Sequence, residues 1–242
     1  MNITLTGFMG TGKTSVGKRL AKALGWELVD VDRLIESSAK MSVPEIFAKR
    51  GEPVFRRLER RVISRIVHSR HQVIATGGGA FIDPGSRARL RLSGPVICLT
   101  ATPQAILERV GKKLSQRPML AKASNPLERI RVLLAQRAST YAKADVTIDT
   151  SDLSTDEVVE RIRREIGPYL CRGWDYLQKH LHELAPRYGG QYVVVANDRI
   201  IACGKTQLAA YQKASPRLTS RCEAGVYYIP LPDESLAASG AA

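Results

Sequence analysis

An eight-residue glycine-rich segment, residues 7–14, constrains this chain more than any other feature. It reads GFMGTGKT, which is a complete phosphate-binding loop of the form GxxxxGK[ST]. The apolar run Ile3–Leu5 precedes the loop, and a helical pattern opens at Lys13. In that context the backbone N–H groups can wrap the phosphates of a nucleotide, Lys13 can reach the β and γ oxygens, and the Thr14 hydroxyl can hold Mg²⁺. The sequence therefore predicts a bound nucleoside triphosphate.

Strand and helix signals alternate along the first 168 residues. Apolar segments predict strands at Ile3–Leu5, Glu27–Val31, Val73–Ala75, Val96–Thr100 and Val146–Asp149. Helical patterns occupy Thr14–Leu24, Val43–Arg50, Pro53–Ser69, Ser86–Leu92, Pro103–Val110, Asn125–Lys143 and Thr155–Ile166. Strands rich in Val and Ile that alternate with helices are typical of a parallel sheet covered on both faces. We therefore predict a three-layer α/β fold.

A second, smaller unit follows this alternation. Gly167-Pro168 ends the last helix and marks the expected boundary of a first domain, residues 1–168. Residues 171–234 then carry signals for a helix at Trp174–Leu184, a hairpin of Gln191–Ala196 and Arg199–Cys203, a helix at Gln207–Ala214 and a strand at Val226–Ile229. This pattern predicts a small α+β module. The last residues, 235–242, are small and polar, and we expect them to be disordered.

The net charge of +14 raises the question of nucleic-acid binding. Few aromatic residues accompany the arginines, and no nucleic-acid motif occurs in the sequence. Because the phosphate loop already requires a polyanionic ligand, we interpret the positive charge as suited to anionic small molecules. Steeply salt-dependent retention on DNA would reveal the alternative.

The sequence also bounds the location of the protein. It has no apolar run of membrane-spanning length, and it passes from Met1 directly into the first expected strand without a signal peptide. The cysteines, at positions 98, 171, 203 and 222, are scattered and form no C-x-x-C pair. We therefore expect a cytoplasmic protein with reduced cysteines and no membrane partner.

Two aspartates, Asp30 and Asp32, stand at the carboxyl end of the second expected strand. Ligands bind at this edge of open parallel sheets, and residues two apart on a strand point the same way. One carboxylate is suited to the Mg²⁺ shell and the other to a substrate hydroxyl. The alternative is that both are ordinary helix N-caps, since Asp is common at strand-to-helix turns.

Three further segments offer groups suited to an anionic substrate. Gly77-Gly78-Gly79 follows the third strand and would let backbone N–H groups approach a ligand closely. Arg56 and Glu59 lie three residues apart on a helix, so the glutamate can hold the guanidinium ready for a carboxylate. Residues 111–124 resemble a mobile lid that delivers Arg117 to the phosphates. The plain alternatives are a flexible turn, a solvated ion pair and a surface loop.

In order and spacing, these motifs resemble those of the shikimate kinases, a branch of the nucleoside monophosphate kinase-like P-loop fold. The resemblance covers about residues 1–168 and rests on GFMGTGKT, DVD, FRRLE, GGG, RPML and QRASTY. It implies transfer of the γ-phosphoryl group of ATP, with Mg²⁺, to the 3-hydroxyl of shikimate in aromatic amino-acid biosynthesis. Shikimate is a small anionic triol, which independently calls for arginines at its carboxylate and a carboxylate at its hydroxyls.

The resemblance further implies roles for individual residues. Catalysis would rest on Asp32 as the base, together with Lys13 and Arg117. ATP would be bound by Gly10, Thr11, Gly12, Lys13, Thr14, Ser15, Arg109 and Arg117. Shikimate would be bound by Asp32, Arg56, Gly77, Gly78, Gly79 and Arg137, with both arginines on its carboxylate. Thr14 and Asp30 would hold Mg²⁺, and we expect the enzyme to be a monomer.

Residues 171–234 extend beyond the usual end of a shikimate kinase and faintly resemble a small prokaryotic module of unknown role. They hold no cluster of catalytic residue types, so we interpret them as a packing module or a site for a partner.

Two other functions stay open at this point. One is another small-molecule kinase, such as one for gluconate, against which Arg56, Arg137 and the glycine turn count. The other is a nucleotide-dependent regulatory protein without catalysis. The intact set of chemical groups counts against it, namely Lys13, Thr14, Asp30, Asp32 and Arg117.

Overall fold

The computed structural model describes residues 1–111, 119–120, 123–167, 173–218 and 224–231. The chain divides into two compact units, Met1–Ile162 and Arg163–Ala242. The division falls within helix α7 (Thr155–Ile166), and the expected break at Gly167-Pro168 begins directly after that helix. Several sequence predictions lie outside the described residues, namely those on Arg117, Pro168, Cys171, Cys222 and segment 235–242.

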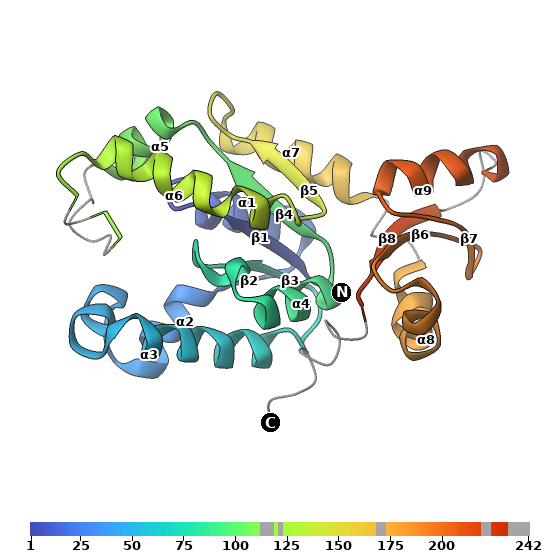
Figure 1. The fold of residues 1–242 in the computed structure, drawn as a ribbon, viewed down its shortest axis with the longest axis horizontal. Helices are drawn as coiled ribbons and strands as arrows, with labels where there is room; N and C mark the ends of the chain where they lie inside the picture. Colours follow the sequence, from blue (N-terminus) through green and yellow to red (C-terminus); the bar gives the residue numbers. More distant parts are fainter. Residues whose placement is uncertain (112–118, 121–122, 168–172, 219–223, 232–242) are drawn as a thin grey trace. The chain divides into compact units, whose positions relative to one another are not determined.

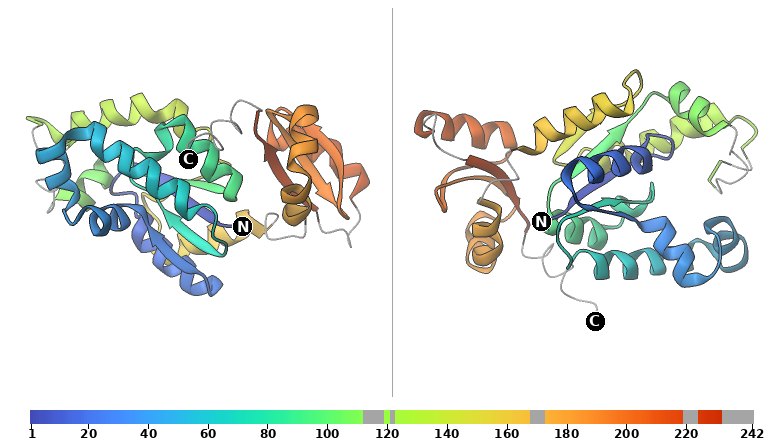
Figure 2. Two further views of the ribbon diagram at one scale, coloured as in Figure 1. Left: turned by 90° about the horizontal axis from the view of Figure 1, so that it is seen from below. Right: turned by 180° about the vertical axis from the view of Figure 1, so that it is seen from behind.

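The first unit is built on a parallel sheet with the strand order β2-β3-β1-β4-β5 (Figure 1). Its strands are β1 (Ile3–Gly7), β2 (Glu27–Asp30), β3 (Gln72–Ala75), β4 (Val96–Thr100) and β5 (Val146–Asp149). Its other helices are α1 (Lys13–Leu24), α2 (Val31–Ala39), α3 (Val43–Ile66), η1 (Ala80–Ile82), α4 (Pro84–Ser93), α5 (Pro103–Val110) and α6 (Pro126–Tyr141). Helices α4 and α6 cover the face turned to the viewer in Figure 1, and α1 covers the opposite face, seen from behind in Figure 2. The predicted three-layer α/β fold is confirmed.

The sheet is buried on both faces because its strands are almost continuously apolar. Ile3 and Leu5 of β1 and Ile97 and Leu99 of β4 are all fully buried. Parallel pairing places Leu5 level with Ala75 on one side and with Ile97 on the other. The carboxyl ends of these strands therefore meet at one edge, where the loops that follow them come together.

Helix α2 was not predicted from the sequence. Strand β2 ends at Asp30, one residue earlier than expected, and α2 begins at Val31. Asp30 is its N-cap, and its Oδ1 accepts a hydrogen bond of 3.3 Å from the backbone N–H of Arg33. The prediction that Asp30 and Asp32 share one side of a strand is therefore wrong, because Asp32 lies in the first turn of a helix.

Helix α3 joins the two helices that the sequence predicted separately, with a kink between them. Ser42 and Glu45 form a reciprocal capping box at its start. Gly51 has a left-handed φ of 79° inside the helix, and Pro53 follows two residues later. The kink separates a first segment, which carries Phe47, from the longer segment that carries Arg56 and Glu59.

The second unit is a small α+β fold, as predicted. It contains α8 (Gly173–Tyr188), β6 (Gln191–Ala196), β7 (Arg199–Gly204), α9 (Gln207–Ala214), η4 (Ser215–Arg217) and β8 (Ala224–Ile229). The antiparallel sheet has the order β7-β6-β8. Asn197 and Asp198 join β6 to β7 with φ angles of 51° and 54°, which suits a tight hairpin turn.

Each face of this second sheet carries a helix. Trp174 of α8 packs on Tyr227 with a ring separation of 5.6 Å, while Ala210 and Ala214 of α9 pack against Val194. Described residues of neither unit form a helix that is long and apolar enough to cross a membrane.

Candidate active site

The phosphate loop adopts a conformation that depends on glycine. Gly10 and Gly12 have φ angles of 79° and 89°, and Gly12 is the N-cap of α1. A Cβ atom on Gly10 would lie 2.8 Å from Cγ1 of Val110, which is too close. Thr11 is fully buried, and its hydroxyl donates a hydrogen bond of 2.8 Å to the Phe8 carbonyl. This hydrogen bond holds the loop in a tight curve, and the positive end of the α1 dipole lies at Gly12.

The Lys13 ammonium group lies over the same loop. Its Nζ donates hydrogen bonds of 2.9 Å to the Gly7 carbonyl and 2.7 Å to the Phe8 carbonyl. These contacts hold a positive charge beside the loop N–H groups that begin α1. An anionic phosphate would meet both kinds of group at this place.

Thr14 and Asp30 bring two oxygen groups together beside the loop. The Thr14 hydroxyl donates a hydrogen bond of 3.0 Å to Oδ2 of Asp30, while Oδ1 of Asp30 caps α2. Hydroxyl and carboxylate oxygens are hard ligands of the kind that Mg²⁺ prefers. Among the described residues, no group of three or more His, Cys, Asp or Glu side chains forms a candidate metal centre.

Two neighbouring cavities, each of about 520 Å³, open at the carboxyl edge of the sheet. The first, here called the nucleotide cavity, is lined by most of the residues predicted to bind ATP and the metal: Gly10, Thr11, Gly12, Lys13, Thr14, Ser15, Asp30 and Arg109. The second, called the acceptor cavity, is lined by those predicted to bind the substrate: Asp32, Arg56, Gly77, Gly78, Gly79 and Arg137. Met9, Asp32 and Gly78 line both cavities. The shared residues mark the junction between them.

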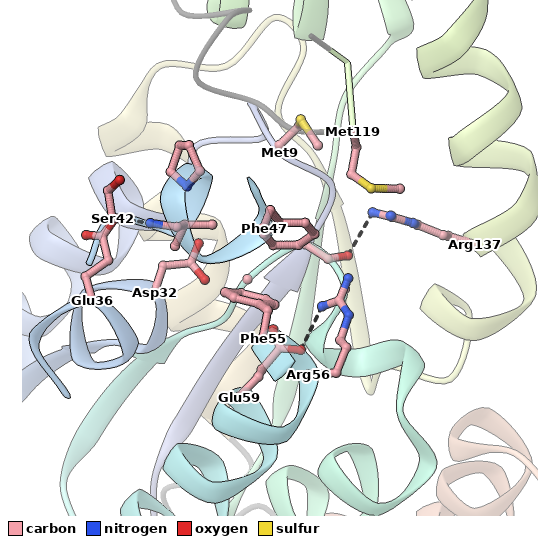
Figure 3. Close-up of a pocket in the computed structure, with 15 residues that line it drawn as sticks. Met9, Asp32, Glu36, Ser42, Phe47, Phe55, Arg56, Glu59, Met119 and Arg137 are labelled. Carbon is pink, nitrogen blue, oxygen red and sulfur yellow. Dashed lines mark hydrogen bonds and ion pairs between the residues drawn. The ribbon is translucent and has the colours of Figure 1, made fainter. Parts of the chain in front are cut away.

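Two guanidinium groups from different helices point into the acceptor cavity (Figure 3). Arg56 of α3 is held by Glu59 at 2.7 Å and by Glu52 at 2.9 Å. Arg137 of α6 donates a hydrogen bond of 3.0 Å to the Gly78 carbonyl and lies over the ring of Phe8. Such a pair of arginines is suited to a planar carboxylate.

Glu59 is a buried carboxylate beside the cavity. It is 1% exposed, and burial raises its pKa to about 7 despite the opposing effect of Arg56. A Cβ atom on Gly77 would lie 2.8 Å from Oδ1 of Asp32 and 2.9 Å from Oε1 of Glu59. The absence of a side chain at Gly77 is therefore what allows both carboxylates to approach the same turn. Gly79 has a similar role, because a Cβ there would lie 2.5 Å from Arg56.

An apolar wall, which could not be predicted from the sequence, completes the acceptor cavity. Phe47 and Phe55 of α3 lie with ring centroids 4.8 Å apart, and Met9 and Met119 line the cavity with them. Glu36 and Ser42 also line it. The sequence carries no local signal for these residues, because aromatic residues at helical spacing equally predict core packing.

Arg109 lines the nucleotide cavity and is held by the segment that follows β5. Its guanidinium donates hydrogen bonds of 2.6 Å to the Thr150 carbonyl and 3.0 Å to the Ser151 carbonyl. The Thr150 hydroxyl lies 2.9 Å from the Thr100 carbonyl and 3.3 Å from the Thr11 carbonyl. Nη1 of Arg109 donates at 3.5 Å to the Gly10 carbonyl. Arg109 thus ties the segment after β5 to the phosphate loop, while Arg117 lies outside the described residues.

Comparisons with known proteins show similarity to the shikimate kinases. The family model described as shikimate kinase matches residues 9–167. A shikimate kinase of Thermoanaerobacter pseudethanolicus is 47% identical over 161 residues, which are 66% of this chain and 93% of that protein. One from Thermus thermophilus is 46% identical over 160 residues, covering 66% and 86% respectively. The structure of shikimate kinase from Acinetobacter baumannii in complex with shikimate matches with a TM-score of 0.66 and 35% identity, over 70% of this chain and 95% of that one.

Proposed function

Because the chain belongs to the shikimate kinase family, we propose a role for each site residue in the transfer of a phosphoryl group from ATP to shikimate. The chain is an ATP-dependent shikimate kinase, which transfers the γ-phosphoryl group to the 3-hydroxyl in aromatic amino-acid biosynthesis. The match lies within residues 9–167, so the activity belongs to the part of the chain that carries the two cavities.

In this proposal, ATP occupies the nucleotide cavity. The backbone N–H groups of Gly10–Ser15 bind the phosphates, and Lys13 contacts the β and γ oxygens. Arg109 borders the nucleotide at its adenine end, held in place by its bonds to Thr150 and Ser151. We assign Arg117, which lies outside the described residues, to the transferred phosphate, on the basis of the family motif alone.

Thr14 and Asp30 hold Mg²⁺ in this arrangement. Their oxygens fit the ion, because Mg²⁺ in kinases binds one or two protein oxygens and completes its shell with phosphates and water. When bound, the ion supplies positive charge to the phosphate oxygens.

Shikimate occupies the acceptor cavity. Arg56 and Arg137 bind its carboxylate from two sides, and the N–H groups of Gly77–Gly79 contact its hydroxyls. The rings of Phe47 and Phe55 face the carbon ring. The combination of two cations, one carboxylate and an apolar wall suits a small anionic triol.

Asp32 receives the proton of the 3-hydroxyl as the hydroxyl oxygen of shikimate attacks the γ-phosphorus and ADP leaves with the β–γ bridging oxygen. The transition state of phosphoryl transfer is loose, so Asp32 acts mainly by positioning and need not be a strong base. The observation that carries this role is that Asp32 lines both cavities and therefore faces the junction between acceptor and nucleotide.

The test is an assay of ADP release with MgATP, comparing shikimate, gluconate and no acceptor. We expect turnover that depends on shikimate and stays at background level with gluconate. Background release with shikimate, from a folded protein that still binds ATP, would contradict the proposed function.

The remaining proposals concern the whole chain. We propose that it acts as a monomer in the cytoplasm, because one chain lines both cavities and because ATP is available there. Residues 171–234 form a packing module or a site for a partner rather than a second active site. Both faces of their sheet are already covered by helices, which supports this reading.

A further inference from the structure

The carbonyl oxygen of Gly78 accepts hydrogen bonds from two side chains of helix α6. Arg137 Nη1 donates at 3.0 Å and Tyr141 Oη at 2.6 Å. The two donors are four residues apart and so lie on one face of the helix. Gly78 lines both cavities, so its peptide group stands at their junction.

The two donors differ in what else they can bind. Arg137 lines the acceptor cavity and carries five N–H donors, which the proposed function directs to the substrate carboxylate. Tyr141 is 6% exposed, belongs to the hydrophobic core and has a single O–H donor. Burial raises the pKa of its hydroxyl to about 12, so it keeps its proton under ordinary assay conditions.

We propose that Tyr141 is a positioning residue, which keeps the Gly78 carbonyl hydrogen-bonded when Arg137 turns to the substrate carboxylate. This inference rests on the proposed role of Arg137. In the free protein the carbonyl has both donors, whereas in the proposed complex the substrate carboxylate draws Nη1 of Arg137 away and the Tyr141 hydroxyl stays. In Tyr141→Phe the Gly78 carbonyl would keep Arg137 as a donor in the free protein. Once Arg137 turns to the substrate carboxylate, the carbonyl would have no described donor. The loss of this donor therefore costs more in the shikimate complex than in the free protein, which keeps the Arg137 donor.

The same hydrogen bond orients the peptide group between Gly78 and Gly79. No cis peptide bond occurs among the described residues, and a trans peptide directs its C=O and N–H to opposite sides. With the carbonyl turned to α6, the Gly79 N–H is turned away from that helix. Gly79 lines the acceptor cavity, so Tyr141 also helps to fix the orientation of a peptide group in the wall of that cavity.

The test is the substitution Tyr141→Phe, which removes the hydroxyl and keeps the ring. We expect the KM for shikimate to rise about 3- to 30-fold, while kcat and the KM for ATP stay within about twofold. The rise in melting temperature that shikimate produces should shrink in parallel, because that rise follows affinity. Tyr176→Phe is the matched control, since it removes a tyrosine hydroxyl from α8 of the second unit.

The role also predicts a coupling with Arg137. In an Arg137→Met background the Gly78 carbonyl has no arginine to lose on binding, so Tyr141→Phe should change the shikimate-dependent melting shift little further. Calorimetric binding of shikimate to the four proteins of this cycle gives the same comparison without catalysis.

Three results would overturn the inference. One is a wild-type KM for shikimate in Tyr141→Phe. Another is an equal rise in both KM values with a lower melting temperature of the free protein, which would make Tyr141 purely structural. The third is a loss of shikimate binding on Tyr141→Phe that is as large in the Arg137→Met background as in the wild-type background. Wild-type protein without shikimate-dependent turnover would instead contradict the proposed function, and this role with it.

Discussion

Oε2 of the buried Glu59 accepts a hydrogen bond of 2.7 Å from Nη1 of Arg56. On the other side of the guanidinium, Glu52 accepts bonds of 2.9 Å from Nη2 and 3.1 Å from Nε. Carboxylates of the same helix therefore hold the arginine before any ligand binds. An arginine ordered in this way loses less conformational freedom when it meets a substrate carboxylate.

Glu59 should make stability depend on pH. Its pKa is raised from 4.5 to about 7, mainly by burial. Below pH 4.5 the carboxyl is protonated in both the folded and the unfolded chain. As pH rises from there towards 7, the unfolded chain releases this proton while the folded chain retains it, so the free energy of unfolding falls.

Glu59→Gln removes this titration. The free energy of unfolding of the variant, relative to wild type, should therefore rise by roughly 1–3 kcal/mol between pH 4.5 and pH 7.5. Urea titrations in a Trp174→Phe background would measure it, because Trp26 fluorescence then reports on the first unit. A difference that is constant with pH would contradict the burial-driven shift.

Arg56→Ala should weaken shikimate binding selectively. It removes half of the carboxylate site and leaves Glu59 buried without its cation, so the KM for shikimate should rise about 10- to 1000-fold while the KM for ATP changes little. Steady-state kinetics with each substrate varied in turn give both constants. Arg57→Ala is the matched control, because Arg57 is the next residue and is exposed. Equal rises in both KM values would refute the assigned role.

Lys13→Ala should reduce turnover by about 10²- to 10³-fold or more, because it removes the positive charge that lies beside the phosphate loop. ADP release under saturating shikimate measures the loss. Lys18→Ala, five residues further along α1 and exposed, should keep wild-type turnover. Wild-type activity in Lys13→Ala would overturn the assignment of the nucleotide cavity.

Asp32→Asn should lower kcat about 100-fold and leave ATP affinity within about twofold. The amide keeps the shape of the side chain but accepts no proton. Pre-steady-state ADP formation, together with binding of a fluorescent ATP analogue, separates the two effects. A loss of ATP binding as large as the loss of kcat would mean that Asp32 serves the nucleotide rather than the acceptor.

A chain ending at residue 170 should retain shikimate-dependent turnover within about threefold of the full chain. The aligned 161 residues make up 93% of the Thermoanaerobacter relative, so the catalytic unit exists there without the second unit. Parallel assays of both chains, with circular dichroism to check folding, provide the measurement. A folded but inactive truncation would show that residues 171–242 take part in catalysis.

Local sequence patterns were sufficient for most elements of both units. The loop GFMGTGKT, the apolar strands and the Asn197-Asp198 turn each depend on neighbouring residues, so their structures follow from short segments. Helix α2 was missed because its start was assigned to the preceding strand, and the distinction depends on Asp30 capping the helix. The kink in α3 was expected as a break, since Gly51 and Pro53 mark it in the sequence.

The sequence by itself therefore determined the fold class, the phosphate loop and the residue types available for an anionic substrate. Only the tertiary structure decided how those groups meet. Asp32 reaches the junction of the cavities through a helix rather than a strand, and Glu59 acquires its raised pKa from burial beneath Gly77. The Tyr141 hydroxyl meets the Gly78 carbonyl across 63 residues of chain. Such contacts depend on how distant elements pack, and no local pattern of residues encodes that.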